Sequence, residues 1–166
     1  LGSAITTSGL QTYTGAVTLG VGTTLTSTDS AISFGSTIDG AYALTISNGS
    51  GAITLGHMGS VTPLTSLTLQ GTGTNTLGGD LVTTGAIDLK GTSRATSFDA
   101  DRTITTTDAN VTFGALNSAY GLTIAAGSGT VSFASVGAST PLAFLSMTGA
   151  GINTLTSNIS VAGGSL

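Results

Sequence analysis

Apolar and polar residues alternate along much of this chain with a period of two. Triplets that read apolar, polar, apolar stand at residues 17–19, 32–34, 44–46, 53–55 and 67–69, and again at 111–113, 122–124, 131–133 and 145–147. A period of two places alternate side chains on opposite faces of a β-strand, so each triplet predicts a very short strand with one apolar face. Gly, Ser, Asn and Asp separate the triplets, as expected for tight turns.

The chain also repeats itself, with equivalent residues 78 positions apart. Residues 39–77 and 117–155 are identical at 18 of 39 positions, including Thr62-Pro63-Leu64 against Thr140-Pro141-Leu142. Upstream the offset becomes 79, which aligns Thr28-Asp29 with Thr107-Asp108. The predicted organisation is a single segment over residues 1–166, with repeat units 1–76 and 77–154 and a partial unit 155–166. We expect this segment to come from a longer array.

Within each unit, equivalent strands recur 20 to 24 positions apart, as from Ile32 to Ile53 and from Leu44 to Leu67. One set of such short strands cannot bury its own apolar face, so the units must close into a sandwich or barrel or stack as a solenoid. The repeat persists to both ends, which favours an all-β parallel β-helix of about seven or eight coils, roughly 35 Å long. Its outer faces are then expected to carry columns of threonine, among them Thr18, Thr45, Thr54 and Thr68.

Four stretches resemble a known repeat family. They are residues 11–19 (QTYTGAVTL), 23–26 (TTLT), 32–35 (ISFG) and 41–46 (AYALTI). Together they look like the filamentous-haemagglutinin-type repeats of large bacterial surface exoproteins that use two-partner or autotransporter secretion. The resemblance implies a right-handed parallel β-helix rod, extracellular and displayed at a Gram-negative cell surface. The partners expected for such a rod are neighbouring repeats or identical subunits end to end, and host or neighbouring-cell surface glycans or proteins.

Composition narrows the function classes. The 166 residues include 26 Gly, no Cys, seven acidic residues that are all Asp, and only three strong bases, Lys90, Arg94 and Arg102. Three cations in a chain of net charge −4 cannot neutralise a phosphate backbone, so nucleic acid is not an expected partner. The apolar content of 39% argues against disorder. No apolar run approaches the length of a transmembrane helix, so no transmembrane segment is expected.

The densest charge lies at Asp99, Asp101 and Arg102, with Asp88, Lys90 and Arg94 nearby in sequence. If residues 99–101 formed a strand, Asp99 and Asp101 would point the same way, as in the paired carboxylates of a β-helix polysaccharide lyase or hydrolase. The alternative is a solvated turn before residues 103–105. The corresponding residues 19–22 of the first unit carry no charge, which favours the turn, and we predict that the protein is not an enzyme.

Metal and cofactor sites are not predicted either. His57 is the only histidine, and Ser135 replaces it in the second unit. The sequence Gly78-Gly79-Asp80 is similar to a calcium-binding nonapeptide, but it occurs once. Asp29 and Asp108 do recur, and each is expected to be a turn residue whose carboxylate accepts backbone N–H groups, in preference to a metal ligand. The sequence therefore predicts no catalytic, cofactor-binding or metal-binding residues and no cofactor.

Three functions remain open at this point. The preferred one is an extracellular structural or adhesive protein whose solenoid forms a stiff stalk or filament, with Tyr42, Tyr120 and the threonine columns as its contact surface. Regular outward threonines on a flat face of low charge also fit an ice-binding protein, although the spacing here is irregular. A carbohydrate-active β-helix enzyme is the third. Since neither end carries a helix, lysine or proline block, we expect the ends to stack on adjoining repeats or identical subunits.

Overall fold

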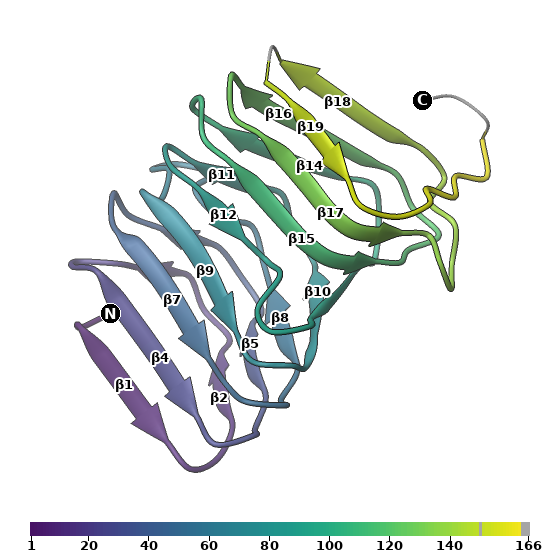
Figure 1. The fold of residues 1–166 in the computed structure, drawn as a ribbon. Coiled ribbons are helices and arrows are strands. Elements are labelled where there is room, and N and C mark those ends of the chain that lie inside the picture. Colours follow the sequence, from purple (N-terminus) through teal and green to yellow (C-terminus); the bar gives the residue numbers. More distant parts are fainter. Residues whose placement is uncertain (150, 164–166) are drawn as a thin grey trace.

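The computed structural model describes residues 1–149 and 151–163 and shows a right-handed β-solenoid of about seven turns (Figure 1). All strand pairs in this part of the chain are parallel, and no helix occurs in it. Coil follows coil from the N-terminal end at β1 to the C-terminal end at β18 and β19, which lie at opposite ends of the rod. The prediction of an all-β solenoid built from tandem repeats is confirmed.

Each coil contributes strands to as many as three faces, which we number in chain order. Face 1 contains β1 (Ala4–Thr7), β4 (Thr23–Ser27), β7 (Ala43–Ser47), β9 (Ser66–Gln70) and β12 (Ile87–Asp88). Face 2 contains β2 (Gln11–Tyr13), β5 (Ile32–Phe34), β8 (Ile53–Leu55), β10 (Thr74–Leu77) and β13 (Ala95–Phe98). Face 3 contains β3 (Val17–Thr18), β6 (Ile38–Asp39), β11 (Leu81–Thr83), β14 (Arg102–Thr106), β16 (Leu122–Gly127) and β18 (Leu145–Gly149).

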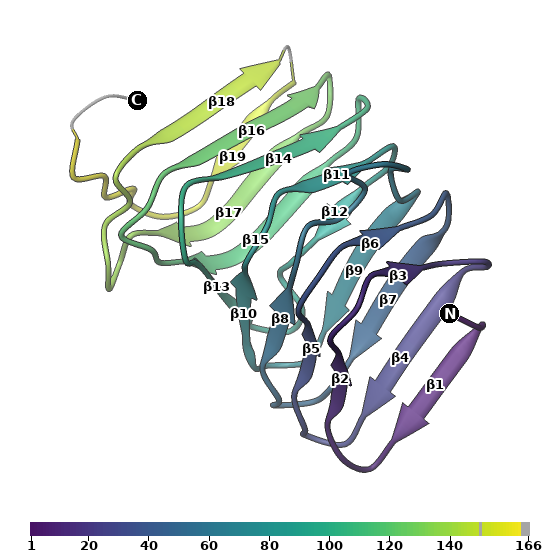
Figure 2. The same ribbon diagram turned by 180° about the vertical axis from the view of Figure 1, so that it is seen from behind.

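Faces 1 and 2 merge towards the C-terminal end. The long strand β15 (Val111–Leu116) pairs through Val111 with β12 of face 1 and through Ala115 with β13 of face 2. β17 (Val131–Val136) continues β15, and β19 (Asn153–Leu155) pairs with the first half of β17. One bent sheet therefore covers two sides of the rod, and face 3 closes the third side (Figure 2).

The core is a set of rows that run along the rod, because in-register pairing stacks residue upon residue. One row follows Leu44, Leu67, Ile87, Val111 and Val131, all nearly or fully buried. Like side chains also stack: Phe113 lies on Phe133 with ring centroids 5.0 Å apart, close to the spacing between strands. The predicted partners Ile32 with Ile53 and Leu44 with Leu67 are paired as expected.

The long sequence repeat does not correspond to a whole number of coils. Three coils lead from Leu44 to Val111, and Leu122, the repeat equivalent of Leu44, stands about halfway along the next coil from Val111 to Val131. Leu44 accordingly belongs to β7 on face 1, whereas Leu122 belongs to β16 on face 3. Equivalent residues of the two units thus lie on different faces of the rod, as the positions of β7 and β16 show (Figures 1 and 2).

Candidate functional site

The aspartates form one system of contacts between successive coils. Asp29 and Asp108 both have positive φ (53°), and Oδ1 of each accepts the backbone N–H of a serine in the next coil, Ser50 and Ser128, at 2.8 Å. The backbone N–H and then the hydroxyl of that serine hold the pKa of each carboxyl below its ordinary value of 3.8. The prediction of a turn carboxylate that accepts N–H groups is confirmed, with its partner one coil further along.

Three further aspartates do the same. Oδ1 of Asp39 accepts the N–H of Val61 at 2.8 Å, Oδ1 of Asp80 that of Thr103 at 2.8 Å, and Oδ1 of Asp101 that of Gly121 at 2.7 Å. Asp88 accepts the N–H of Lys90 within its own coil at 2.9 Å. A carboxylate that accepts backbone N–H groups tightens a turn and aligns the two coils it joins.

The predicted charge cluster separates into structural contacts. β13 ends at Phe98 and β14 begins at Arg102, so Asp99 and Asp101 lie in a turn, as the alternative interpretation held. Asp99 forms an ion pair with Arg102, while Asp101 binds the backbone of the next coil. The structure therefore gives the two carboxylates different partners and does not make them an acid and base pair.

The other metal candidates also have partners in the backbone. Nδ1 of His57 accepts the N–H of Asp80 at 3.2 Å, which joins two coils at the sequence Gly78-Gly79-Asp80. Among residues 1–149 and 151–163, no three His or Asp side chains come together in an arrangement that could hold a metal ion. Within the same residues, no helix is long and apolar enough to span a membrane.

Arg94 is the exception among the charged residues, because it is fully buried. It enters a corner between faces 1 and 2 that is built from residues 48–53 and 69–75, and we call this the Arg94 corner. Its guanidinium donates to the carbonyl of Gln70 through Nη2 at 2.9 Å and Nε at 3.1 Å, and to Oδ1 of Asn75 at 3.0 Å. It also donates to Oδ1 of Asn48, and burial lowers the pKa of the guanidinium below its ordinary range.

The two asparagines are themselves held in place. Nδ2 of Asn48 donates to the carbonyl of Ala52 at 3.1 Å, and Nδ2 of Asn75 donates to that of Leu89 at 3.0 Å. Arg94 therefore connects three successive coils with one side chain. Arg94 is near the charged stretch at residues 99–102 in sequence, but in the structure it is buried and takes no part in that cluster. The sequence did contain one sign of this buried polar contact. Asn75 occupies an inward position of its strand, and its paired neighbour in the adjacent coil is the apolar Ile53.

Threonine columns occupy the outer faces, but they are short. On face 1, Thr24, Thr45 and Thr68 are paired neighbours, and Asp88 takes the next position. On face 3, Thr103 and Thr123 are paired, and Ser146 follows. Of the residues predicted to belong to threonine columns, Thr45 pairs with Thr68 on face 1 and Thr54 pairs with Thr76 on face 2, whereas Thr18 pairs with Asp39.

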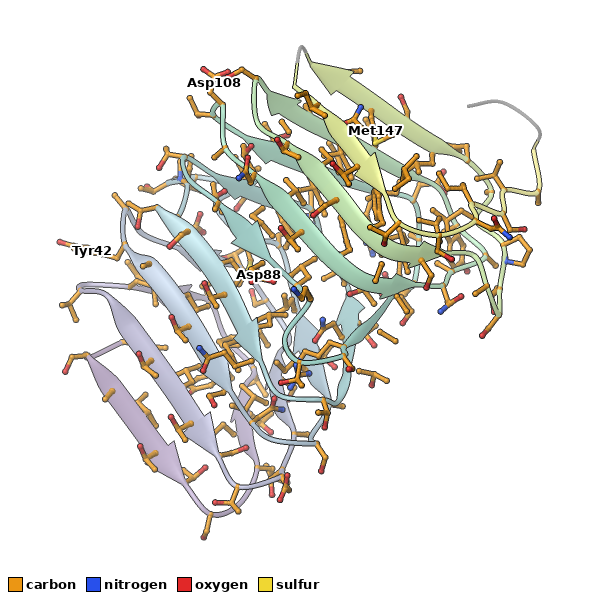
Figure 3. The ribbon with its side chains drawn as sticks, viewed as in Figure 1. Tyr42, Asp88, Asp108 and Met147 are labelled. Atoms are coloured by element: carbon orange, nitrogen blue, oxygen red, sulfur yellow. The ribbon has the colours of Figure 1, made fainter. Side chains whose placement is uncertain are left out.

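The two tyrosines proposed for contact do not share a surface. Tyr42, just before β7, is 42% exposed and projects from the side of the rod (Figure 3). Tyr120 is 44% exposed and lies just before β16 on face 3. The half-coil phase of the repeat separates them, so a ligand that touches both would have to reach around the rod.

No family model, curated protein or solved structure matches this chain. The resemblance to filamentous-haemagglutinin-type repeats therefore stays a prediction. What the described residues offer chemically is a series of polar contacts that join coil to coil, together with strand edges at the first and last coils that no other described strand pairs.

Proposed function

We propose that this chain is a segment of an extracellular structural or adhesive protein, in which stacked coils form a stiff stalk or filament at a bacterial cell surface. The assignment of the cell surface rests on the resemblance stated above. The proposed stiffness of the stalk is supported by the contacts of the charged residues. The seven carboxylates and Arg94 bind partners in the same or neighbouring coils, so the charged groups hold the coils together.

The proposal is carried by two properties of the first and last coils, which are unpaired strand edges and a lack of charged side chains. β1 pairs with β4 on one side, and at the other end β18 pairs with β16 and β19 with β17, so each end presents a strand edge in register for another coil. All ten charged residues lie between Asp29 and Asp108, so residues 1–28 and 109–166 contain none. Natural proteins protect open edges with charge, and this chain leaves its end regions uncharged.

Apolar side chains add to the C-terminal end. Ile152 is 77% exposed and Leu155 is 44% exposed, and Leu155 stands directly beyond the buried Phe133 in a core row. A further coil stacked there would remove both side chains from water. The same coil would complete the hydrogen bonds of two strands.

Sedimentation velocity over about 5 to 500 µM chain, with electron microscopy of the same samples, tests the proposal. We expect the sedimentation coefficient to rise with concentration and the particles to be rods one solenoid wide. The variant Ile152→Lys/Leu155→Lys adds charge to the C-terminal edge and should remain monomeric. Tyr42→Lys/Val61→Lys adds the same charge to exposed positions on the sides and should associate like the unchanged chain. An unchanged chain that stays monomeric at the highest concentration would refute end-to-end stacking.

A further inference from the structure

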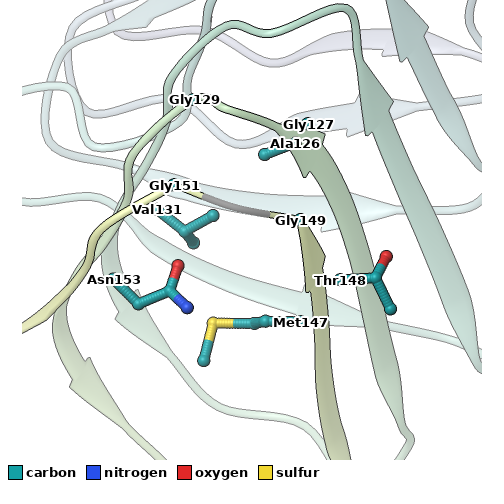
Figure 4. A pocket seen from close by; sticks show the side chains of 9 residues that line it. All are labelled: Ala126, Gly127, Gly129, Val131, Met147, Thr148, Gly149, Gly151 and Asn153. Carbon is teal, nitrogen blue, oxygen red and sulfur yellow. The ribbon is translucent and has the colours of Figure 1, made fainter.

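A hollow at the C-terminal end of the rod is the repeat equivalent of the Arg94 corner (Figure 4). The space between its lining atoms is about 180 Å³ when open solvent is included, and only about 10 Å³ of it accommodates the centre of a water molecule, so the hollow is shallow and open. Each residue that lines it stands 78 positions after a residue of the Arg94 corner: residues 126–131 correspond to 48–53, and residues 147–149 with 151–153 correspond to 69–71 with 73–75.

The backbone of the two corners has the same design. Gly49 and Gly127 have φ values of 55° and 58°, and a Cβ on either would collide with Oδ1 of Asp29 or Asp108. Gly71 and Gly149 both have positive φ, and in each case a Cβ would collide with the carbonyl oxygen of Gly49 or Gly127. The carbonyls that surround the guanidinium in the first corner therefore have counterparts in the second.

Most acceptors of the Arg94 guanidinium have a counterpart among the residues that line the hollow. The carbonyls of Gln70 and Gly51 correspond to those of Thr148 and Gly129, and Oδ1 of Asn75 corresponds to Oδ1 of Asn153. One acceptor is lost, because Ala126 stands where the first corner has Asn48. Asn75 is fully buried whereas Asn153 is exposed, and the side chains of Asn153 and Met147 lie at the hollow (Figure 4).

We propose that this hollow binds the guanidinium group of an arginine carried by a coil stacked on the C-terminal end of the rod. The proposal deepens the stacking function above and rests on it for the source of the arginine. An arginine is the expected occupant because Arg94, which comes from the following coil, fills the equivalent Arg94 corner. Planar N–H donors match converging carbonyl and amide oxygens, whereas an ammonium group cannot satisfy several of them in one plane.

The chemistry of the hollow can be tested without any stacking. The intact chain is titrated with ethylguanidinium chloride, and amide and side-chain shifts are followed by NMR. A ligand of this size should bind with a Kd on the order of 1–50 mM. Saturable shifts are expected at Gly127, Gly129, Gly151 and the Asn153 side chain, with a Kd at least about fivefold weaker in Asn153→Leu and for ethylammonium. Asn158→Leu, the same substitution in the same end segment but outside the lining, should bind like the unchanged chain.

Equal response to ethylammonium, or an unchanged Kd in Asn153→Leu, would overturn the inference. If ethylguanidinium binds selectively while the chain stays monomeric in sedimentation, the stacking function fails and the chemistry of the hollow stands. If rods form without guanidinium selectivity, the hollow has no such role and the stacking function stands.

The source of the arginine has its own test. In an extended chain, a second copy of residues 77–98 replaces residues 155–166, so the copied arginine follows Asn153 at the same separation as Arg94 follows Asn75. The expected result is a higher urea midpoint than in the same extended chain with Arg94→Met in the copy only. Equal midpoints would show that a stacked coil does not deliver its arginine to the hollow.

Discussion

Replacing the buried arginine by an apolar residue of similar length is the most informative perturbation of this fold. Arg94→Met keeps much of the side-chain volume but removes every donor from the Arg94 corner. Oδ1 of Asn48, Oδ1 of Asn75 and the carbonyl of Gln70 then lose the partner that the guanidinium supplies. A buried acceptor left without a donor costs about 1–3 kcal/mol, and removing one partner of a buried charged contact costs about 3–5 kcal/mol.

The substitution also removes the desolvation cost of the guanidinium, which opposes these losses. The net expectation is a decrease of about 2–5 kcal/mol in the free energy of unfolding. Urea denaturation followed by circular dichroism measures it, with hydrogen exchange to show whether the coils of β7 to β13 open first. Lys90→Met removes the same charge from an exposed side chain close by in sequence, and its effect should stay within about 0.5 kcal/mol.

A double-mutant cycle separates the contact from the loss of charge. Asn75→Leu on its own removes an acceptor of Arg94 and should be destabilising. In the Arg94→Met background it should cost about 1–3 kcal/mol less, because the partner is already gone. An Arg94→Met chain as stable as the unchanged one, or additive effects of the two substitutions, would refute the claim that this guanidinium holds three coils together.

Three further outcomes follow from the geometry. Gly49→Ala forces a side chain into positive φ and onto Asp29, so it should lower Tm by several degrees, whereas Gly22→Ala, with open space at its Cβ, should not. Since the folded-state pKa values of Asp29 and Asp108 are lowered, their stabilisation is complete above the ordinary pKa of 3.8 and is lost as pH falls through the lower folded values. Between pH 6 and pH 2, Tm should therefore fall less steeply in Asp29→Asn/Asp108→Asn than in the unchanged chain. An equally steep fall in both would contradict the stabilising role of these two carboxylates. Because Asp88 interrupts the face 1 threonine column after three coils, we expect no thermal hysteresis beyond that of a control protein. A measurable difference between the melting and freezing temperatures of ice in its presence would favour the ice-binding alternative.

The strands and their pairing could be predicted from the sequence because the physics is local and periodic. In-out alternation identifies an inward row such as Leu44 with Leu67, and the long repeat shows that the pattern has no closing strand. Asp29 and Asp108 were also within reach, since an aspartate that recurs between a threonine and a core strand is typical of a turn. What local pattern did not reveal was the partner, because Ser50 lies 21 residues away, one coil along the rod.

The phase of the repeat and the Arg94 corner could not be predicted for a different reason. Coil lengths along face 1 are unequal, since the coil from Asp88 to Thr112 is longer than the coil from Thr68 to Asp88, and a half-coil offset depends on their sum. Arg94 contacts Asn48 across 46 residues, a separation set by two particular coils. An arginine in a chain with few charges is expected at the surface, and only the stacking of the coils places Arg94 inside.

The half-coil phase limits how such a rod can present a surface. A feature of one unit, such as the edge that carries Tyr42, reappears as the edge with Tyr120 on the other side, and only a third unit would restore the first side. Seven coils separate β1 from β19 on face 1, so a repeated feature would return to one face about every 34 Å at a strand spacing of about 4.8 Å. Contacts with a flat partner would then come from alternate units, and a stalk that contacts partners on both sides would use every unit. Core rows tolerate this alternation because a buried row needs only apolar residues of similar size, whichever unit supplies them. An outer column does not tolerate the alternation, because the threonines of one unit are not continued by those of the next. The threonine columns of the two units therefore stay short and lie on different faces.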